Sequence, residues 1–154
     1  MYYSIDFGDF DANDNFVSQA NTWEDWHLIP SSRPTIVTPQ PKTNLVKIPG
    51  RSGSLDLSNY LYGTHPVYGP RTGTLEFYVA NDIEPWMDIR RKIAAVLHGK
   101  RIKMVLEDEP EYYYEGRFKF SVWNSGNGHS TVSIEYQLDP FKYLVDKSSN
   151  EGVI

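Results

Sequence analysis

Alternation of apolar and polar residues is the clearest pattern in this chain, and it is strongest in the second half. Apolar residues occupy every second position over 117–122 and again over 131–138, and a stretch rich in Gly and Asn, 124–128, separates the two runs. Two period-2 runs around such a turn predict a β-hairpin. The same alternation predicts further strands at 75–79 and 102–106.

One segment follows the 3.6-residue period of an α-helix instead. Between residues 84 and 98, Trp86, Ile89 and Ile93 fall on one helical face. Gly99, followed by two basic residues, is a helix stop signal. The chain is therefore expected to be mainly β with one α-helix, which lies between two strands.

Residues 30–70 follow neither period, because seven of the ten prolines and four glycines are found there. Proline cannot donate a hydrogen bond to a sheet, so long loops, an edge ribbon or an extended arm are expected. Two short strand candidates, 46–48 and 55–57, flank the turn residues 49–53. Two interpretations stay open: irregular surface connections, or an arm that leaves its own domain and embraces a neighbouring subunit.

The composition excludes several classes of protein. A chain of 154 residues has the size of one domain, and its net charge of −5 lacks the basic footprint of a general nucleic-acid binder. The absence of cysteine removes disulfides, thiolate zinc sites and cysteine nucleophiles. No apolar run reaches the roughly 18 residues of a membrane span, and no leader follows Met1. A soluble protein made in a reducing cytosol, without membrane insertion, is expected.

The sequence lacks the usual signatures of catalysis and metal binding. It contains no G-x-S-x-G elbow, no H-E-x-x-H pair and no glycine-rich phosphate loop. The stretch from Asp9 begins like a calcium loop, but Asp14 and Ala20 stand where its glycine and glutamate belong. The acidic stretch 107–111 crowds its carboxylates into one turn, which favours a solvated loop over a glycosidase pair. The interpretation is a binding or structural protein, with no enzymatic activity, cofactor or metal.

Aromatic residues make up 14% of the chain, and two explanations are possible. Aromatic side chains at alternating strand positions pack the core of a β-rich protein. Exposed Trp and Tyr side chains also form the stacking platforms of carbohydrate-binding modules. The candidate platform consists of Trp23, Trp26, Tyr112, Tyr113 and Tyr114.

Several motifs, in their order along the chain, resemble the N-terminal domain of the distal tail protein family of long-tailed bacteriophages. Residues 47–58 read K-I-P-G-R-S-G-S-L-D-L-S, 112–118 read Y-Y-Y-E-G-R-F, and 138–143 read L-D-P-F-K-Y. The resemblance spans about residues 1–143, which would form one domain. The motif residues are Pro49, Gly50, Arg51, Gly53, Asp56, Gly116, Asp139, Pro140 and Phe141.

The resemblance implies a β-sandwich related to phage tail-tube folds, with one helix near 84–98 and an extended hairpin arm, or belt, near 28–50. It implies a homohexameric ring in the virion tail, assembled in the host bacterial cytoplasm. Such a hub joins the tail tube to the baseplate and receptor-binding proteins of host attachment, and DNA passes through it without specific binding. The arm residues expected at the subunit interface are Arg33, Pro34, Ile36, Pro39, Pro41, Val46 and Ile48.

The C-terminal part departs from many members of this family, in which a second domain, often carbohydrate-binding, follows the motif around Asp139. Here residues 144–154 are expected to form a tail, or a linker to an absent second domain, and their polar run predicts a frayed end. The resemblance also implies that the protein belongs to a phage or prophage. Two alternatives stay open: a carbohydrate-binding module that uses exposed Trp and Tyr, and a tail-tube protein of related fold.

Overall fold

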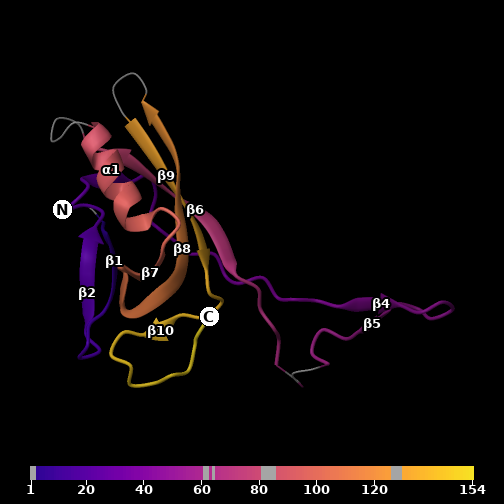
Figure 1. Ribbon diagram of the computed structural model, residues 1–154. Coiled ribbons are helices and arrows are strands. Elements are labelled where there is room, and N and C mark those ends of the chain that lie inside the picture. Colours follow the sequence, from indigo (N-terminus) through magenta and orange to yellow (C-terminus); the bar gives the residue numbers. More distant parts are fainter. Residues whose placement is uncertain (1–2, 61–62, 64, 81–85, 126–129) are drawn as a thin grey trace.

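The computed structural model describes residues 3–60, 63, 65–80, 86–125 and 130–154. Figure 1 shows a body that contains the helix and most strands, and a ribbon that projects from it. The helix α1 spans Trp86–Leu97, and the ribbon carries β4 (Leu45–Lys47) and β5 (Ser54–Asp56). The strands of the body are β1 (Ile5–Phe10), β2 (Phe16–Asn21), β3 (Leu28–Pro30), β6 (Arg71–Val79), β7 (Arg101–Leu106), β8 (Glu109–Ser125), β9 (Ser130–Leu138) and β10 (Tyr143–Leu144).

The body is built on one curled antiparallel sheet with the strand order β2-β1-β7-β8-β9-β6-β3, and β10 pairs with β8 outside this path. The long strand β8 makes the curl, because its first half pairs with β7 and its second half pairs with β9. Gly116 pairs with both neighbours. A Cβ at this position would lie 2.6 Å from the Cα of Leu138 and against the carbonyl of Gln137, so the close approach of β9 requires glycine.

The hydrophobic core lies inside this curl, which gives the sheet the character of a β-sandwich. Phe7 of β1 contacts Phe118 of β8 with ring centroids 5.1 Å apart, and the ring of Trp26 lies 5.8 Å from that of Phe7. The predicted mainly β fold is confirmed. Residues at inward positions of the predicted alternation are buried, and these are Leu75, Phe77, Val79, Ile102, Met104, Leu106, Phe118, Phe120, Val132, Ile134, Tyr136 and Leu138.

The predicted hairpin over 117–122 and 131–138 is confirmed by the pairing of β8 with β9. Its loop, residues 126–129, and the side chain of Val122 lie outside the described residues. The register shifts between Phe120 and Val122, which marks a β-bulge in β8. The bulge adds local twist to the strand that already carries the bend of the sheet.

Helix α1 covers the core with its apolar face, on which Ile89, Ile93 and Leu97 are buried. The prediction of one helix near 84–98 is confirmed over Trp86–Leu97, and residues 84 and 85 lie outside the described part of the chain. Gly99 follows with a φ of 71°, a conformation common after helix C-termini. Within the described residues, no helix has both the length and the apolar character needed to span a bilayer.

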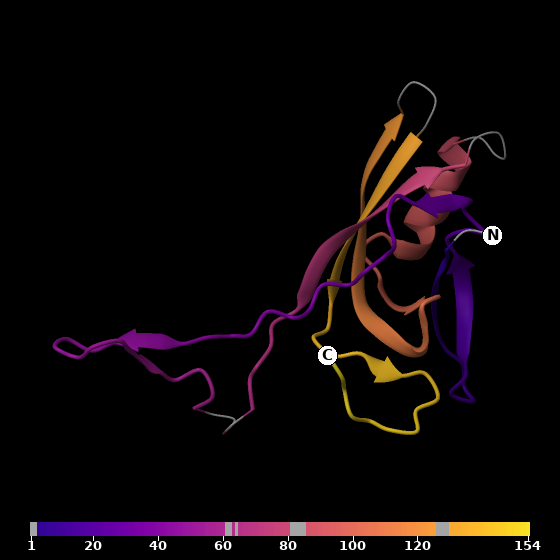
Figure 2. The same cartoon turned by 180° about the vertical axis from the view of Figure 1, so that it is seen from behind.

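The ribbon consists of the described residues between 38 and 69, and it points away from the body in both views (Figures 1 and 2). Its limits differ from the expected arm at 28–50. Strand β3 belongs to the main sheet, because it pairs with β6 and buries Leu28 completely. The return strand β5 lies beyond residue 50 and completes the hairpin.

The last residues lie along the body, and the expectation of a frayed end at 144–154 does not describe them. Strand β10 pairs with β8, and Lys142 exchanges two backbone hydrogen bonds of 2.8 and 2.9 Å with Val153. The ammonium group of Lys147 lies 2.7 Å from the carboxylate of Asp14 and 4.1 Å from the ring centroid of Phe10. These partners are distant in the sequence, so the local polarity of the segment does not reveal them.

Candidate functional site

The ribbon is distinguished from the body by apolar side chains that have little to pack against within the chain. Strands β4 and β5 form a two-stranded sheet in which Val46 lies opposite Leu55. Leu45, Val46 and Ile48 are 61%, 39% and 40% exposed. A two-stranded hairpin is marginally stable alone in water, and a group of exposed apolar side chains marks a binding surface. The ribbon is therefore the candidate functional site.

The tip of the ribbon is a turn that needs its glycines. Gly50 and Gly53 have φ values of 79° and 73°, in the left-handed region that side chains with a Cβ rarely adopt. The backbone N–H of Arg51 donates to the carbonyl of Ile48 at 3.2 Å. Pro49 and Arg51 are exposed at the far end of the ribbon.

Asp56 stabilises the base of this hairpin. Its carboxylate accepts a hydrogen bond of 2.9 Å from the backbone N–H of Ser58, and hydrogen bonds from the hydroxyl and backbone of Ser58 hold the pKa of Asp56 below its usual value. The Oγ of Ser58 in turn accepts from the N–H of Asn44 at 2.8 Å. This motif residue therefore ties the return strand to the outgoing one.

Arg71 fastens the root of the ribbon from inside the body. Arg71 is only 2% exposed, and its guanidinium donates to the carbonyl of Val37 at 3.1 Å and to that of Pro140 at 3.0 Å. It lies 5.4 Å from the ring centroid of Tyr114. Burial lowers the pKa of Arg71 and raises the pKa of Tyr114 to about 12. A single arginine thus joins the start of the ribbon to the C-terminal segment.

This role of Arg71 was not predicted, although the sequence contains a signal for it. Arg71 stands at an inward-facing position of the alternating strand β6, in phase with the buried Leu75 and Phe77. A charged residue in that phase must find buried hydrogen-bond acceptors, because an unpaired buried charge is costly.

The predicted interface residues fall into two groups, of which the first lies on the body or at the root. Arg33 forms a bidentate pair with Asp108, with two N···O distances of 2.6 Å, and this pair lowers the pKa of the Asp108 carboxyl. Pro34 and Pro39 are buried, and Ile36 packs against the core. These four residues contact their own chain. The predicted residues that are exposed on the ribbon are Pro41, Val46 and Ile48.

The motif residues near the end of the body also support the root of the ribbon. Asp139 pairs with Arg101, and the carbonyl of Pro140 accepts the hydrogen bond from the buried Arg71. The ring of Phe141 stands edge-on to that of Tyr68, at the return of the ribbon, with centroids 5.9 Å apart. These residues hold the C-terminal segment against the place where the ribbon leaves the body.

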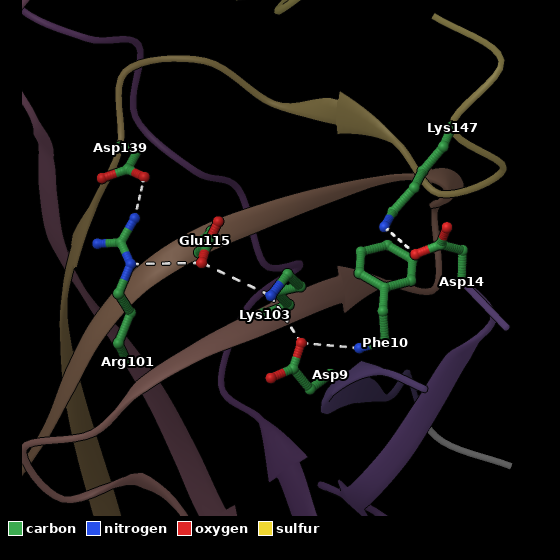
Figure 3. Close-up of polar contacts among 8 residues, drawn as sticks. All are labelled: Asp9, Phe10, Asp14, Arg101, Lys103, Glu115, Asp139 and Lys147. Carbon is green, nitrogen blue, oxygen red and sulfur yellow. Dashed lines mark hydrogen bonds and ion pairs between the residues drawn. The ribbon is translucent and has the colours of Figure 1, made fainter. Parts of the chain in front are cut away.

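A row of alternating charges crosses strands β8, β7 and β1 (Figure 3). Arg101 contacts Asp139 and lies 3.3 Å from Glu115, and Lys103 lies 3.6 Å from Glu115 and 2.7 Å from Asp9. The hydrogen bond from Lys103 lowers the pKa of Asp9. Each of these charges has an opposite partner in its own chain. The row therefore stabilises the sheet, and the sequence analysis had not paired these residues.

The acidic stretch 107–111 is better connected than the solvated loop that was expected. Glu107 accepts a hydrogen bond of 2.7 Å from the backbone N–H of Ser4, Glu109 contacts Lys142, and the carboxylate between them pairs with Arg33. Within the described residues, no group of three metal-binding side chains gathers anywhere. The stretch therefore attaches the N-terminal segment and the segment leading to the ribbon.

The five aromatic residues of the candidate carbohydrate platform do not share one surface. Trp26 is 1% exposed and contacts Phe7 in the core. Tyr114 is 5% exposed, and its hydroxyl lies 3.4 Å from Glu109. An exposed stacking platform cannot include these two side chains, so the proposed set is wrong as a single binding surface.

The curled sheet, the single described helix and the projecting ribbon together form the fold known from the phage tail-hub protein Dit. A solved structure with this fold is SPP1 Dit, described as a paradigm of hub adsorption apparatus in Gram-positive infecting phages. The TM-score is 0.56 with 21% sequence identity, over 94% of this chain and 53% of that one. This chain thus spans about half the length of SPP1 Dit. The expected resemblance to distal tail proteins is confirmed at the level of the fold.

The match to SPP1 Dit is structural, and comparisons of the amino-acid sequence give none. No family model matches this chain, and no curated protein sequence matches it.

Proposed function

We propose that this protein is a structural component of a bacteriophage or prophage tail tip. Six copies form a hub ring that joins the tail tube to the baseplate or receptor-binding proteins, and the opening of the ring forms part of the DNA channel. The partners are a second copy of the chain and other tail-tip and tail-tube proteins, in the virion tail after assembly in the host cytoplasm.

The observation that carries this proposal is the Dit-like fold over 94% of the chain. The ribbon supports it, because a projecting hairpin with exposed apolar side chains suits a subunit that must grip a neighbour. A head-to-tail contact of this kind closes into a ring when its rotation permits. The net charge of −5 per copy also suits a conduit through which DNA slides without binding.

A tail-tube protein of related fold is the second candidate, because the same kind of subunit can stack. The two differ in what they assemble: a hub stops at one ring, and a tube protein continues into open-ended stacks. The carbohydrate-binding alternative loses Trp26 and Tyr114 from its candidate platform, because both side chains are buried.

Mass and symmetry in solution test this proposal. Light scattering joined to negative-stain images is expected to give a mass of six protomers and rings with sixfold symmetry. Open-ended tubes would favour the tail-tube protein instead. A monomer at every accessible concentration would contradict both assemblies.

A further inference from the structure

Strand β2 lies at one end of the main sheet, and within the described residues its outer edge has no partner strand. Its sequence F-V-S-Q-A-N contains no charge and no proline, the features that usually protect such an edge. Val17, Ser18 and Gln19 are exposed. An uncharged, uncovered edge of this kind is a template for another strand.

The ribbon offers the complementary surface. Among the described residues, β4 and β5 pair only with each other, so each strand has backbone groups free to pair on its outer side. Val46 and Ile48 are exposed on it, and Val17 on β2 is 49% exposed. Pairing the two elements would cover apolar side chains of both.

The two elements lie on opposite sides of the molecule. In both views β2 lies on the side of the body that is far from the ribbon (Figures 1 and 2). The tip of the ribbon is the part of the ribbon farthest from β2. The ribbon of one copy therefore cannot reach the β2 edge of the same copy. A contact between them must join two copies head to tail, which is the heterologous arrangement that builds rings.

The N-terminal region that surrounds β2 and the ribbon carry opposite charges. Residues 1–32 contain six Asp and Glu and no Lys or Arg, whereas residues 38–58 contain three Lys and Arg and one Asp. Asp9 and Asp14 are already paired with Lys103 and Lys147, and the other four acidic side chains keep this region negative. Opposite charge brings two surfaces together and fixes their orientation.

A cleft beside the start of β2 has a lining whose chemistry complements that of the ribbon tip. Phe16, Pro110 and Val145 give the cleft apolar walls, and Glu111 and Asp146 add acidic groups. The tip presents the matching chemistry, because it combines the apolar pair 48–49 with basic residues on either side.

We propose that the unpaired edge of β2, with its adjoining cleft, receives the ribbon of a second copy as an added antiparallel or parallel strand. This inference rests on the proposed ring, and it names the surface on which each ribbon binds. The acidic N-terminal hairpin is then the acceptor, and the basic ribbon is the donor.

Engineered cysteines test the contact directly, because the chain has none of its own. A variant with both Val17→Cys and Val46→Cys is expected, on mild oxidation, to give a covalent ladder of up to six chains on a non-reducing gel. Val17→Cys with Ile48→Cys samples a neighbouring register. The matched control is Val17→Cys with Val153→Cys, which places the second thiol at an equally exposed valine outside the ribbon.

A charge on the edge tests the same contact without cross-linking. Val17→Lys is expected to raise the protein concentration needed for hexamer assembly at least tenfold, and Val153→Lys is expected to leave it unchanged. Equal thermal unfolding of the two variants at a concentration where both are monomeric checks that neither has lost its fold.

The outcomes distinguish failure of the β2 acceptor from failure of the proposed ring. Hexamers that form without either cross-link, and that tolerate Val17→Lys, would overturn the β2 acceptor and leave the ring standing. Cross-linked dimers of the single variant Val17→Cys would indicate pairing of two β2 edges and would also overturn it. An unmodified chain that stays monomeric would overturn both the ring and the acceptor.

Discussion

The body and the ribbon of this protein differ in whether their apolar side chains are buried. In the body, Phe7, Trp26 and Phe118 are almost completely buried, and Phe7 contacts the other two rings. On the ribbon, Leu45 and Val46 remain exposed although they are just as apolar. The body is therefore specified by contacts within the chain, whereas the ribbon leaves apolar surface uncovered by its own chain.

This difference predicts which substitutions lower the stability of the single chain and which weaken assembly. Substitutions in the body should lower the stability of the single chain, and substitutions on the ribbon should spare it and weaken assembly. Substitutions at the root of the ribbon, such as at Arg71, should both lower the stability of the chain and weaken assembly.

Truncation of an apolar side chain should be costly in the body and nearly neutral on the ribbon. Phe118→Ala is expected to lower the free energy of unfolding by about 3–5 kcal/mol, because it removes a buried ring and leaves a cavity. Val46→Ala is expected to change it by less than about 0.5 kcal/mol, because the side chain is exposed. Urea unfolding at a concentration where the protein is monomeric measures both. Similar losses of unfolding free energy in the two variants would contradict this difference between body and ribbon.

Removal of the Arg71 guanidinium should have an intermediate effect. Arg71→Met leaves the carbonyls of Val37 and Pro140 without their donor, so a loss of about 1–3 kcal/mol is expected. The root should also loosen, and trypsin should cleave after Lys42 faster than in the unmodified chain.

The matched control for this prediction is Arg117→Met. Arg117 also donates to a carbonyl, that of Gly99 at 3.0 Å, but it is exposed and lies far from the ribbon in the sequence. Unchanged cleavage after Lys42 in Arg71→Met would show that the ribbon keeps its place without this side chain.

The pH dependence should give the smallest effect, and it should again separate body from ribbon. The hydrogen bond from Lys103 lowers the pKa of Asp9 in the folded chain. A lowered folded-state pKa contributes stability above the unfolded value near 3.8, and this contribution disappears as the pH falls through the lower folded value. Asp9→Asn should therefore lower the urea midpoint slightly at pH 7 and leave it unchanged near pH 2.

The ribbon provides the control, because the pKa of Asp56 is also lowered, by hydrogen bonds from Ser58. Asp56→Asn should not change the urea midpoint of the body at any pH, since β5 contributes nothing to its core. A loss of body stability in Asp56→Asn as large as in Asp9→Asn would mean that ribbon and body unfold as one unit.

The strands and the helix could be predicted because their signals are local. Alternation at 75–79, 102–106 and 131–138 reflects a face that must be buried, and the helix shows its own period. The ribbon was harder to delimit. Its apolar positions resemble those of an ordinary strand, and nothing local distinguishes Leu28, which is buried by β6, from Val46, which is not.

The candidate site was predictable only in part for the same reason. The turn around Gly50 and Gly53 and the exposure of Val46 and Ile48 agree with a projecting arm. Arg33, however, pairs with Asp108, 75 residues away, and no feature of the local sequence could indicate this.

The element types, the mainly β class and the glycine at the bend of β8 follow from the order of the amino acids, because each depends on backbone geometry and on which face is apolar. Tertiary structure was needed to show where the chain leaves its body and which charges neutralise one another. It also decided that the edge of β2 faces away from the ribbon. These features depend on contacts between distant segments, and the free energy of such contacts is set when the curled sheet brings the segments together.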